Sequence, residues 1–100
     1  MNKESNISKE YKTFKKYILT LDKEEIFDRA FEINFYTEIY NYIKYLDKES
    51  RKLYHIDSLE IWKLFNFYTD SDLYSIESQN NILMLINAYN KYRKENNEIR

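Results

Sequence analysis

The sequence contains no Gly and no Pro among its 100 residues. These two residues make most tight turns, because Gly adopts positive φ without strain and Pro fixes φ. Their absence favours helices joined by short turns. Hydrophobic residues make up 43% of the chain, and a chain of this length hides roughly two-thirds of its unfolded surface on folding. We therefore expect one all-α domain over residues 1–100, with frayed ends at about 1–6 and 95–100.

The spacing of apolar residues predicts a compact bundle of about five helices. In the first helix, apolar side chains recur every three or four residues among Lys and Glu, which indicates one buried face. These apolar residues are Ile7, Tyr11, Phe14 and Ile18. The five helices are expected at about 8–19, 23–45, 48–54, 58–68 and 72–94.

Three helix starts carry recognisable capping residues. Asp22 is followed three residues later by Glu25, and Asp57 is followed in the same way by Glu60. In such a capping box the first side chain accepts a bond from the backbone of the third helical residue, and the Glu reaches back. Asp47 is expected to cap a third, shorter helix.

The expected helix over 23–45 is apolar on two sides. A helix of this kind is either central in a bundle or partly an interface with another molecule. One stripe consists of Ile26, Ala30, Ile33 and Tyr40, and the nearly opposite stripe of Phe31, Phe35, Ile39, Tyr42 and Leu46.

Two blocks of the chain resemble a family of small helical domains of unknown function from low-GC Gram-positive bacteria and their mobile elements. The first block is Glu24-Glu25-Ile26, Ala30-Phe31-Glu32 and Glu38-Ile39, and the second is Glu60-Ile61-Trp62-Lys63 followed by Phe65. The similarity covers about residues 15–90. It implies a mostly helical domain in a mobile-element setting, and it supplies no activity.

Composition removes several classes of function. The chain has no Cys, which excludes disulfides and thiol chemistry. Without Gly, neither of the common phosphate-binding loops can form. No apolar run approaches the ~18 residues that span a bilayer, and the polar segment at residues 1–12 lacks the apolar stretch of a secretion signal. We expect a cytoplasmic protein with no membrane association.

Residues suited to catalysis are sparse. The only His, His55, precedes a predicted cap and has no nucleophile or orienting group near it in the sequence. Asp70 and Asp72 have the spacing of two cation ligands, but the Gly and Glu of a calcium loop are missing, so a helix cap is the simpler interpretation. We expect no enzyme activity, no metal and no cofactor.

Acidic and Tyr residues of the second helix form the candidate partner-binding surface. Residues 24–49 carry seven acids against three bases. Acids at a helix start also complement the helix dipole, and the Tyr excess has a second explanation in AT-rich codons. The candidate residues are Glu24, Glu25, Asp28, Glu32, Tyr36, Tyr42 and Tyr45.

These features favour a non-enzymatic protein-binding module of a phage or mobile element. Lys outnumbers Arg twelve to four and Ala occurs only twice, as in AT-rich genomes. One form of this hypothesis is an anti-CRISPR-like inhibitor whose acidic, Tyr-rich surface occupies the nucleic-acid site of a host defence nuclease.

Two alternatives stay open. A small nucleic-acid-associated regulator would bind through the basic first helix, which carries Lys9, Lys12, Lys15 and Lys16, although the net charge of −1 gives no general attraction to nucleic acid. A self-associating structural protein would pair, as a homodimer, through the two-sided second helix.

Overall fold

The computed structural model describes residues 5–70 and 82–99, and over these ranges the protein is an all-α bundle without a strand. The helices are α1 (Asn6–Ile18), α2 (Lys23–Asp28), α3 (Ala30–Lys44), α4 (Lys48–Leu53), the 3-10 helix η1 (Ile56–Ser58), α5 (Ile61–Asp70) and α6 (Ile82–Glu95). The fold class predicted from the sequence is confirmed.

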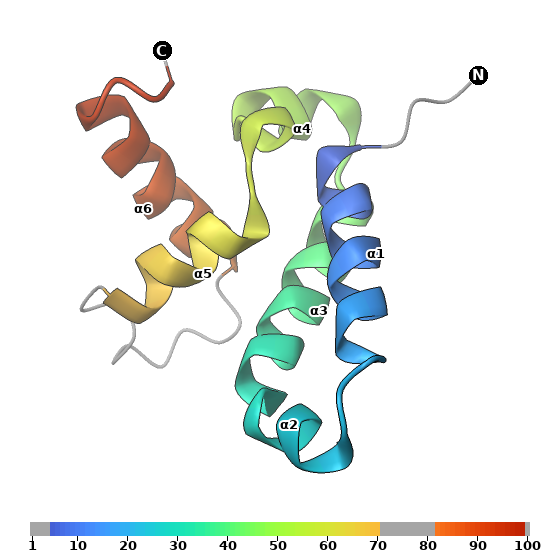
Figure 1. The fold of residues 1–100 in the computed structure, drawn as a ribbon. Coiled ribbons are helices and arrows are strands. Elements are labelled where there is room, and N and C mark those ends of the chain that lie inside the picture. Colours follow the sequence, from blue (N-terminus) through green and yellow to red (C-terminus); the bar gives the residue numbers. More distant parts are fainter. Residues whose placement is uncertain (1–4, 71–81, 100) are drawn as a thin grey trace.

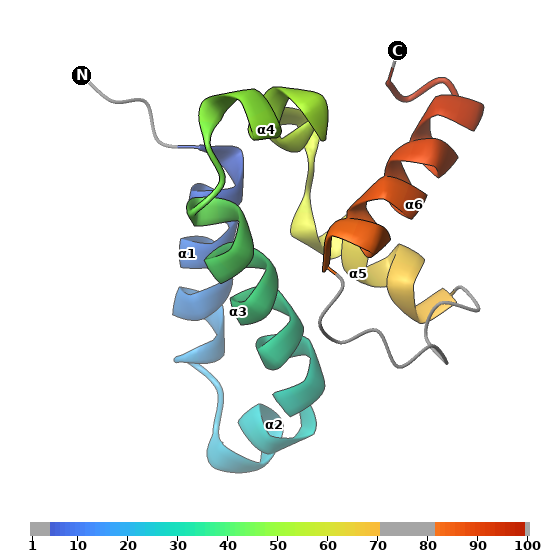
Figure 2. The ribbon, with the colours of Figure 1, turned by 180° about the vertical axis from the view of Figure 1, so that it is seen from behind.

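Two parts of the bundle meet along α3 and α5. Helices α1 and α3 lie side by side, with α2 closing one end of the pair and α4 covering the other (Figure 1). Helix α5 packs against both α1 and α3, and α6 packs against α5 on the side away from α1 (Figure 2). Helix α6 is therefore connected to α1 and α3 mainly through α5.

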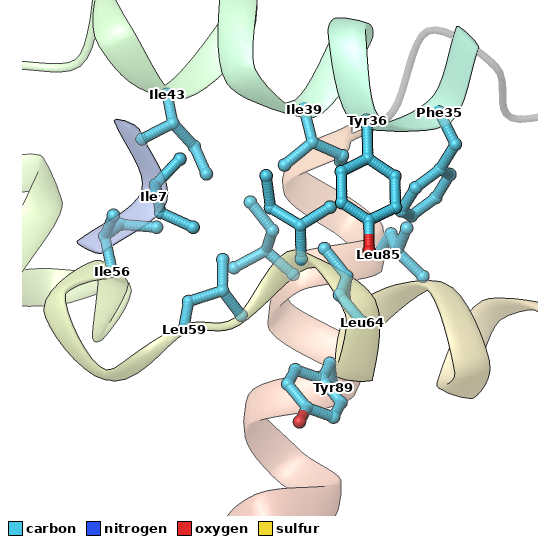
Figure 3. Packing of buried hydrophobic residues seen from close by; sticks show 12 residues of the cluster. Ile7, Phe35, Tyr36, Ile39, Ile43, Ile56, Leu59, Leu64, Leu85 and Tyr89 are labelled. Carbon is cyan, nitrogen blue, oxygen red and sulfur yellow. The ribbon is translucent and has the colours of Figure 1, made fainter. Parts of the chain in front are cut away.

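The hydrophobic core lies where α3, α5 and η1 meet (Figure 3). Ile39 and Ile43 point from α3 toward Ile7 of α1 and toward the η1 segment. Six Ile and two Leu residues are less than 2% exposed, so branched aliphatic side chains fill the centre and most aromatic rings surround it. These residues are Ile7, Ile39, Ile43, Ile56, Leu59, Ile61, Leu64 and Ile86.

Two of the three predicted caps are confirmed. Asp22 Oδ1 accepts from the backbone N–H of Glu25 at 2.9 Å, and Glu25 Oε1 accepts from the N–H of Asp22 at 3.4 Å, which completes the capping box of α2. Asp47 Oδ1 accepts from the N–H of Ser50 at 2.7 Å and caps α4. This bond is the main reason that the pKa of Asp47 lies below its ordinary value.

The predicted helix start at residue 58 is wrong. Asp57 lies inside η1, Leu59 is extended with φ −83° and ψ 135°, and α5 begins only at Ile61. Leu59 is 1% exposed. Its burial in the core requires the extended backbone that a helix from residue 58 would exclude.

The start of α5 is instead capped by a side chain of α1. Glu10 Oε1 accepts from the backbone N–H of Ile61 at 2.6 Å, and Oε2 accepts from that of Trp62 at 2.9 Å. Both are among the N–H groups that a helix leaves without an internal partner. Burial raises the pKa of Glu10 and outweighs these two hydrogen bonds, which lower it.

The helix predicted over 23–45 is divided at Arg29. There φ −100° and ψ 12° depart from helical values, and the N–H of Arg29 is shared between the carbonyls of Glu25 and Ile26. Helix α3 packs against α1, α2 and α5, so its two apolar stripes reflect a central position in the bundle. Its exposed residues are mostly polar or small, apart from one ring, and are Ala30, Phe31, Asn34, Glu38, Asn41 and Lys44.

Polar contacts of buried side chains fix α6 on the η1 segment. Arg93, which is 3% exposed, donates to the carbonyls of Ser58 at 3.2 Å and His55 at 3.3 Å. Asn90 donates to the carbonyl of Tyr54 at 2.7 Å and accepts from Arg93. A buried guanidinium needs such acceptors, because its desolvation is otherwise unfavourable.

Left-handed turns occur here without Gly. His55 follows α4 with φ 53°, and Asn97 follows α6 with φ 59°. The N–H of Asn97 donates to the carbonyl of Lys94, and that of Glu98 to the carbonyl of Arg93, which is a Schellman motif. Fraying beyond residue 95 stays a prediction. The first part of the helix predicted over 72–94 lies outside the described residues.

We predict that Glu10→Ala lowers the free energy of unfolding by about 1–3 kcal/mol, because two backbone N–H groups lose their acceptors at the buried start of α5. Urea unfolding followed by circular dichroism measures the change. Glu38→Ala removes an exposed carboxylate from α3 and should stay within about 0.5 kcal/mol of wild type. Equal effects of the two variants would contradict the capping role.

The pH dependence of this cap has a defined sign. The folded pKa of Glu10 is raised above the ordinary value, so the folded state binds the proton more tightly than the unfolded state. The stabilising contribution of Glu10 should be largest below its unfolded pKa and should decrease as the pH rises through the folded value. The difference in unfolding free energy between wild type and Glu10→Gln, measured from pH 4 to pH 7, should therefore decrease.

Candidate functional site

The acidic residues predicted to bind a partner lie at the end of the bundle that α2 closes (Figure 1). Glu24, Glu25 and Asp28 are exposed, and no residue of α2 is buried. Glu25 also belongs to the capping box of α2. Glu32, on the first turn of α3, is bound to Arg29 at 2.9 Å. Three of the four acids are thus open to a partner, and Glu32 is neutralised.

Tyr36 does not belong to a partner-binding surface, and its assignment is corrected. Its side chain is 6% exposed and belongs to the core. The ring stacks on Phe14 of α1, with ring centres 3.8 Å apart and planes 9° apart. Burial raises the pKa of its hydroxyl above the ordinary value.

The other two candidates, Tyr42 and Tyr45, lie near the C-terminal end of α3, far from the acids of α2. Tyr42 is half-buried and packs on the core. Tyr45 is 81% exposed, but it follows the last residue of α3, while α2 precedes the first. Fifteen helical residues at 1.5 Å each separate the two ends by about 22 Å. The structure therefore does not bring Tyr45 together with the acids.

Phe27 is the surface residue that the sequence interpretation missed. It lies on α2 between Glu24 and Asp28 and is 80% exposed. Around this end of the bundle, Leu19 is 72% exposed and Phe31 is 50% exposed. Glu24, Phe27 and Asp28 have the i, i+3, i+4 spacing of one helix face, and this spacing was the signal available in the sequence. Phe31 lies beyond the break at Arg29, and its ring centre is 5.9 Å from that of Phe65 of α5.

Charge at this end is predominantly negative. Residues 22–28 contain four acids and one Lys, which leaves three net negative charges. Arg29 does not offset them fully, because its guanidinium is hydrogen-bonded to Glu32 and lies 5.3 Å from the centre of the Tyr17 ring. We define the α2 surface as Glu24, Phe27 and Asp28.

The basic first helix offers exposed Lys side chains, but two of its three aromatic rings stack on rings of α3. Lys9, Lys15 and Lys16 are exposed. Tyr11 stacks on Tyr40 of α3 with ring centres 4.3 Å apart, and Phe14 is covered by Tyr36. Tyr17 is 47% exposed, with the guanidinium of Arg29 5.3 Å from its ring centre. Since base stacking needs an open aromatic face, α1 presents mainly phosphate contacts.

No catalytic arrangement is visible in the part of the chain that the structure describes. The imidazole of His55 makes no hydrogen bond there, although its backbone carbonyl accepts from Arg93 and Ser58. No group of three or more His, Cys, Asp or Glu residues has the geometry to hold a metal ion within residues 5–70 and 82–99. Asp70 ends α5, and Asp72 lies outside the described residues.

Comparison with known proteins gave no match among protein-family models, curated proteins or solved structures. The resemblance to a family of helical domains from low-GC bacteria therefore stays a prediction. None of the described helices has the length and apolar character needed to cross a membrane.

We predict a small effect on stability for removal of the exposed Phe27 ring and a large one for removal of the buried Tyr36 ring. Phe27→Ala should change the free energy of unfolding by less than about 0.5 kcal/mol, because the ring is mostly in water. Tyr36→Ala should lower it by about 3 kcal/mol or more, because it leaves a cavity beside Phe14. Thermal and urea unfolding of both variants measures these changes. A large loss in Phe27→Ala would mean that this ring belongs to the core.

Proposed function

We propose that this protein is a non-enzymatic binding module that docks through the α2 surface onto a positively charged site of another protein. The observation that carries the proposal is Phe27, which is 80% exposed on a helix that buries no residue of its own. A large exposed aromatic side chain is unfavourable in water, and in an interface it supplies a rigid anchor.

The surroundings of Phe27 support a basic partner. Glu24 and Asp28 flank the ring on the same helix and are exposed. In protein interfaces a central aromatic anchor contributes most of the affinity, and charges around it steer association. A partner with an apolar pocket rimmed by Lys or Arg complements this arrangement.

The finer proposal is an inhibitor, encoded by a phage or mobile element, of a host defence nuclease. Proteins that bind nucleic acid carry basic grooves that accept phosphates. The carboxylates of α2 present negative charge at one end of a small rigid bundle, so they are suited to occupy such a groove in place of phosphates. The AT-rich composition supports the mobile-element setting.

The proposal is tested by affinity capture from a low-GC bacterial lysate, treated with nuclease, with wild type and matched variants side by side. Glu24→Lys/Asp28→Lys reverses two exposed charges and leaves the Asp22–Glu25 cap intact. Glu38→Lys/Glu95→Lys makes the same change of net charge on exposed sites elsewhere. Partners found by mass spectrometry are then purified and their Kd values measured.

We expect that wild type and the control Glu38→Lys/Glu95→Lys capture one common partner protein, and that Glu24→Lys/Asp28→Lys does not capture it. Phe27→Ala should weaken its Kd roughly 30-fold, as for a residue contributing about 2 kcal/mol, whereas Tyr45→Ala should have little effect. Excess duplex DNA or RNA should displace the protein if the partner is a nuclease. Equal binding by the α2 variant and the control would refute the proposal, and loss of the signal on nuclease treatment would favour nucleic-acid association through the α1 lysines.

A further inference from the structure

A second surface of the protein has the chemistry of a binding site and does not involve α2. A solvent-open hollow of about 390 Å³ lies between helices α5 and α6. Aromatic residues of both helices line it, namely Phe67 of α5 and Tyr89 and Tyr92 of α6. Two carboxylates also line it, Asp70 at the end of α5 and Glu98 after α6.

The three rings form one packed wall. The ring centre of Phe67 lies 5.2 Å from that of Tyr89 and 5.4 Å from that of Tyr92, and the two Tyr rings are 6.2 Å apart. Rings this close contact one another, so no cation fits between them. Tyr89 is 4% exposed and Tyr92 is 44% exposed, so the wall offers the face of Tyr92 and the half-buried Phe67 to a ligand.

The charges around this wall leave an excess of carboxylates. Lys63 also lines the hollow, but its Nζ lies 3.3 Å from Glu60 and 5.5 Å from the Trp62 ring centre. Across residues 5–70 and 82–99, neither Asp70 nor Glu98 forms an ion pair within 4 Å. Two carboxylates with open acceptor positions beside an aromatic wall are complementary to a cation.

The protein already contains one example of this chemistry. The guanidinium of Arg93 lies 5.0 Å from the centre of the Tyr89 ring. Arg93 is 3% exposed, and its charge opposes a second cation nearby. Three carboxylates, those of Glu60, Asp70 and Glu98, stand against the two cations Lys63 and Arg93, which leaves one negative charge for a ligand to neutralise.

We infer that the hollow between α5 and α6 binds an arginine side chain of a partner protein. A planar guanidinium stacks on an open ring face and donates to carboxylates at its edges at the same time. Asp70 and Glu98 supply these acceptors, and Tyr92 with Phe67 supplies the face. A quaternary ammonium group fits less well, because it needs rings arranged around it as a cage.

Titration of the full chain with Nα-acetyl-argininamide, followed by NMR of the aromatic and backbone signals, tests this inference. Nα-acetyl-lysinamide and tetramethylammonium serve as probes with the same charge and different shape. Asp70→Asn/Glu98→Gln removes the two negative charges at exposed positions, so it leaves the core unchanged. Glu38→Gln/Glu95→Gln removes the same number of charges elsewhere and is the matched control.

We expect saturable shifts at Phe67, Tyr89 and Tyr92 with the arginine probe, and weaker binding of the other two. Binding should weaken about fivefold or more in Asp70→Asn/Glu98→Gln, as for a lost charge pair, and should not change in the control. Tyr92→Leu should also weaken it. Equal binding of all three cations, unchanged binding by Asp70→Asn/Glu98→Gln, or absence of saturation would each overturn the inference. These outcomes are independent of the α2 surface.

Discussion

The carboxylate of Glu10 connects the two parts of the bundle. Its oxygens accept from the first two N–H groups of α5, at Ile61 and Trp62. The start of α5 is therefore capped by a side chain of α1. Ile61 and Leu64 are then fully buried, and α6 packs on α5. The position of α6, and with it the hollow that α6 shares with α5, depends on a cap supplied from more than fifty residues earlier.

The contrast among the three predicted caps explains what the sequence can predict. Asp22 and Asp47 each bond to a residue three positions later, so the information is local and the helix starts follow from it. Asp57 has the same local pattern, but the burial of Leu59 requires extended backbone there. A distant carboxylate then replaces the local one, and no local pattern reveals Glu10 as the cap.

The residues of the candidate site also divide into those whose exposure follows from local sequence and those whose exposure depends on distant contacts. The exposure of Glu24 and Asp28 could be predicted, because the capping box fixes the register of α2. The burial of Tyr36 could not, since it results from stacking on Phe14 of another helix, and the chain contains ten other Tyr residues. Phe27 was missed because a continuous helix over 23–45 places it four residues before Phe31, in line with the second apolar stripe, whereas the break at Arg29 leaves it exposed on α2.

The division of the predicted second helix at Arg29 also affects motion. Helix α2 has six residues, buries none of them and carries its own capping box, whereas α3 is anchored by four buried side chains. Segments with few buried contacts open locally at a small free-energy cost, while the core stays folded. We therefore expect amide protons of α2 to exchange with solvent faster than those of α3, so that Phe27 and its carboxylates adjust their direction without disturbing the bundle.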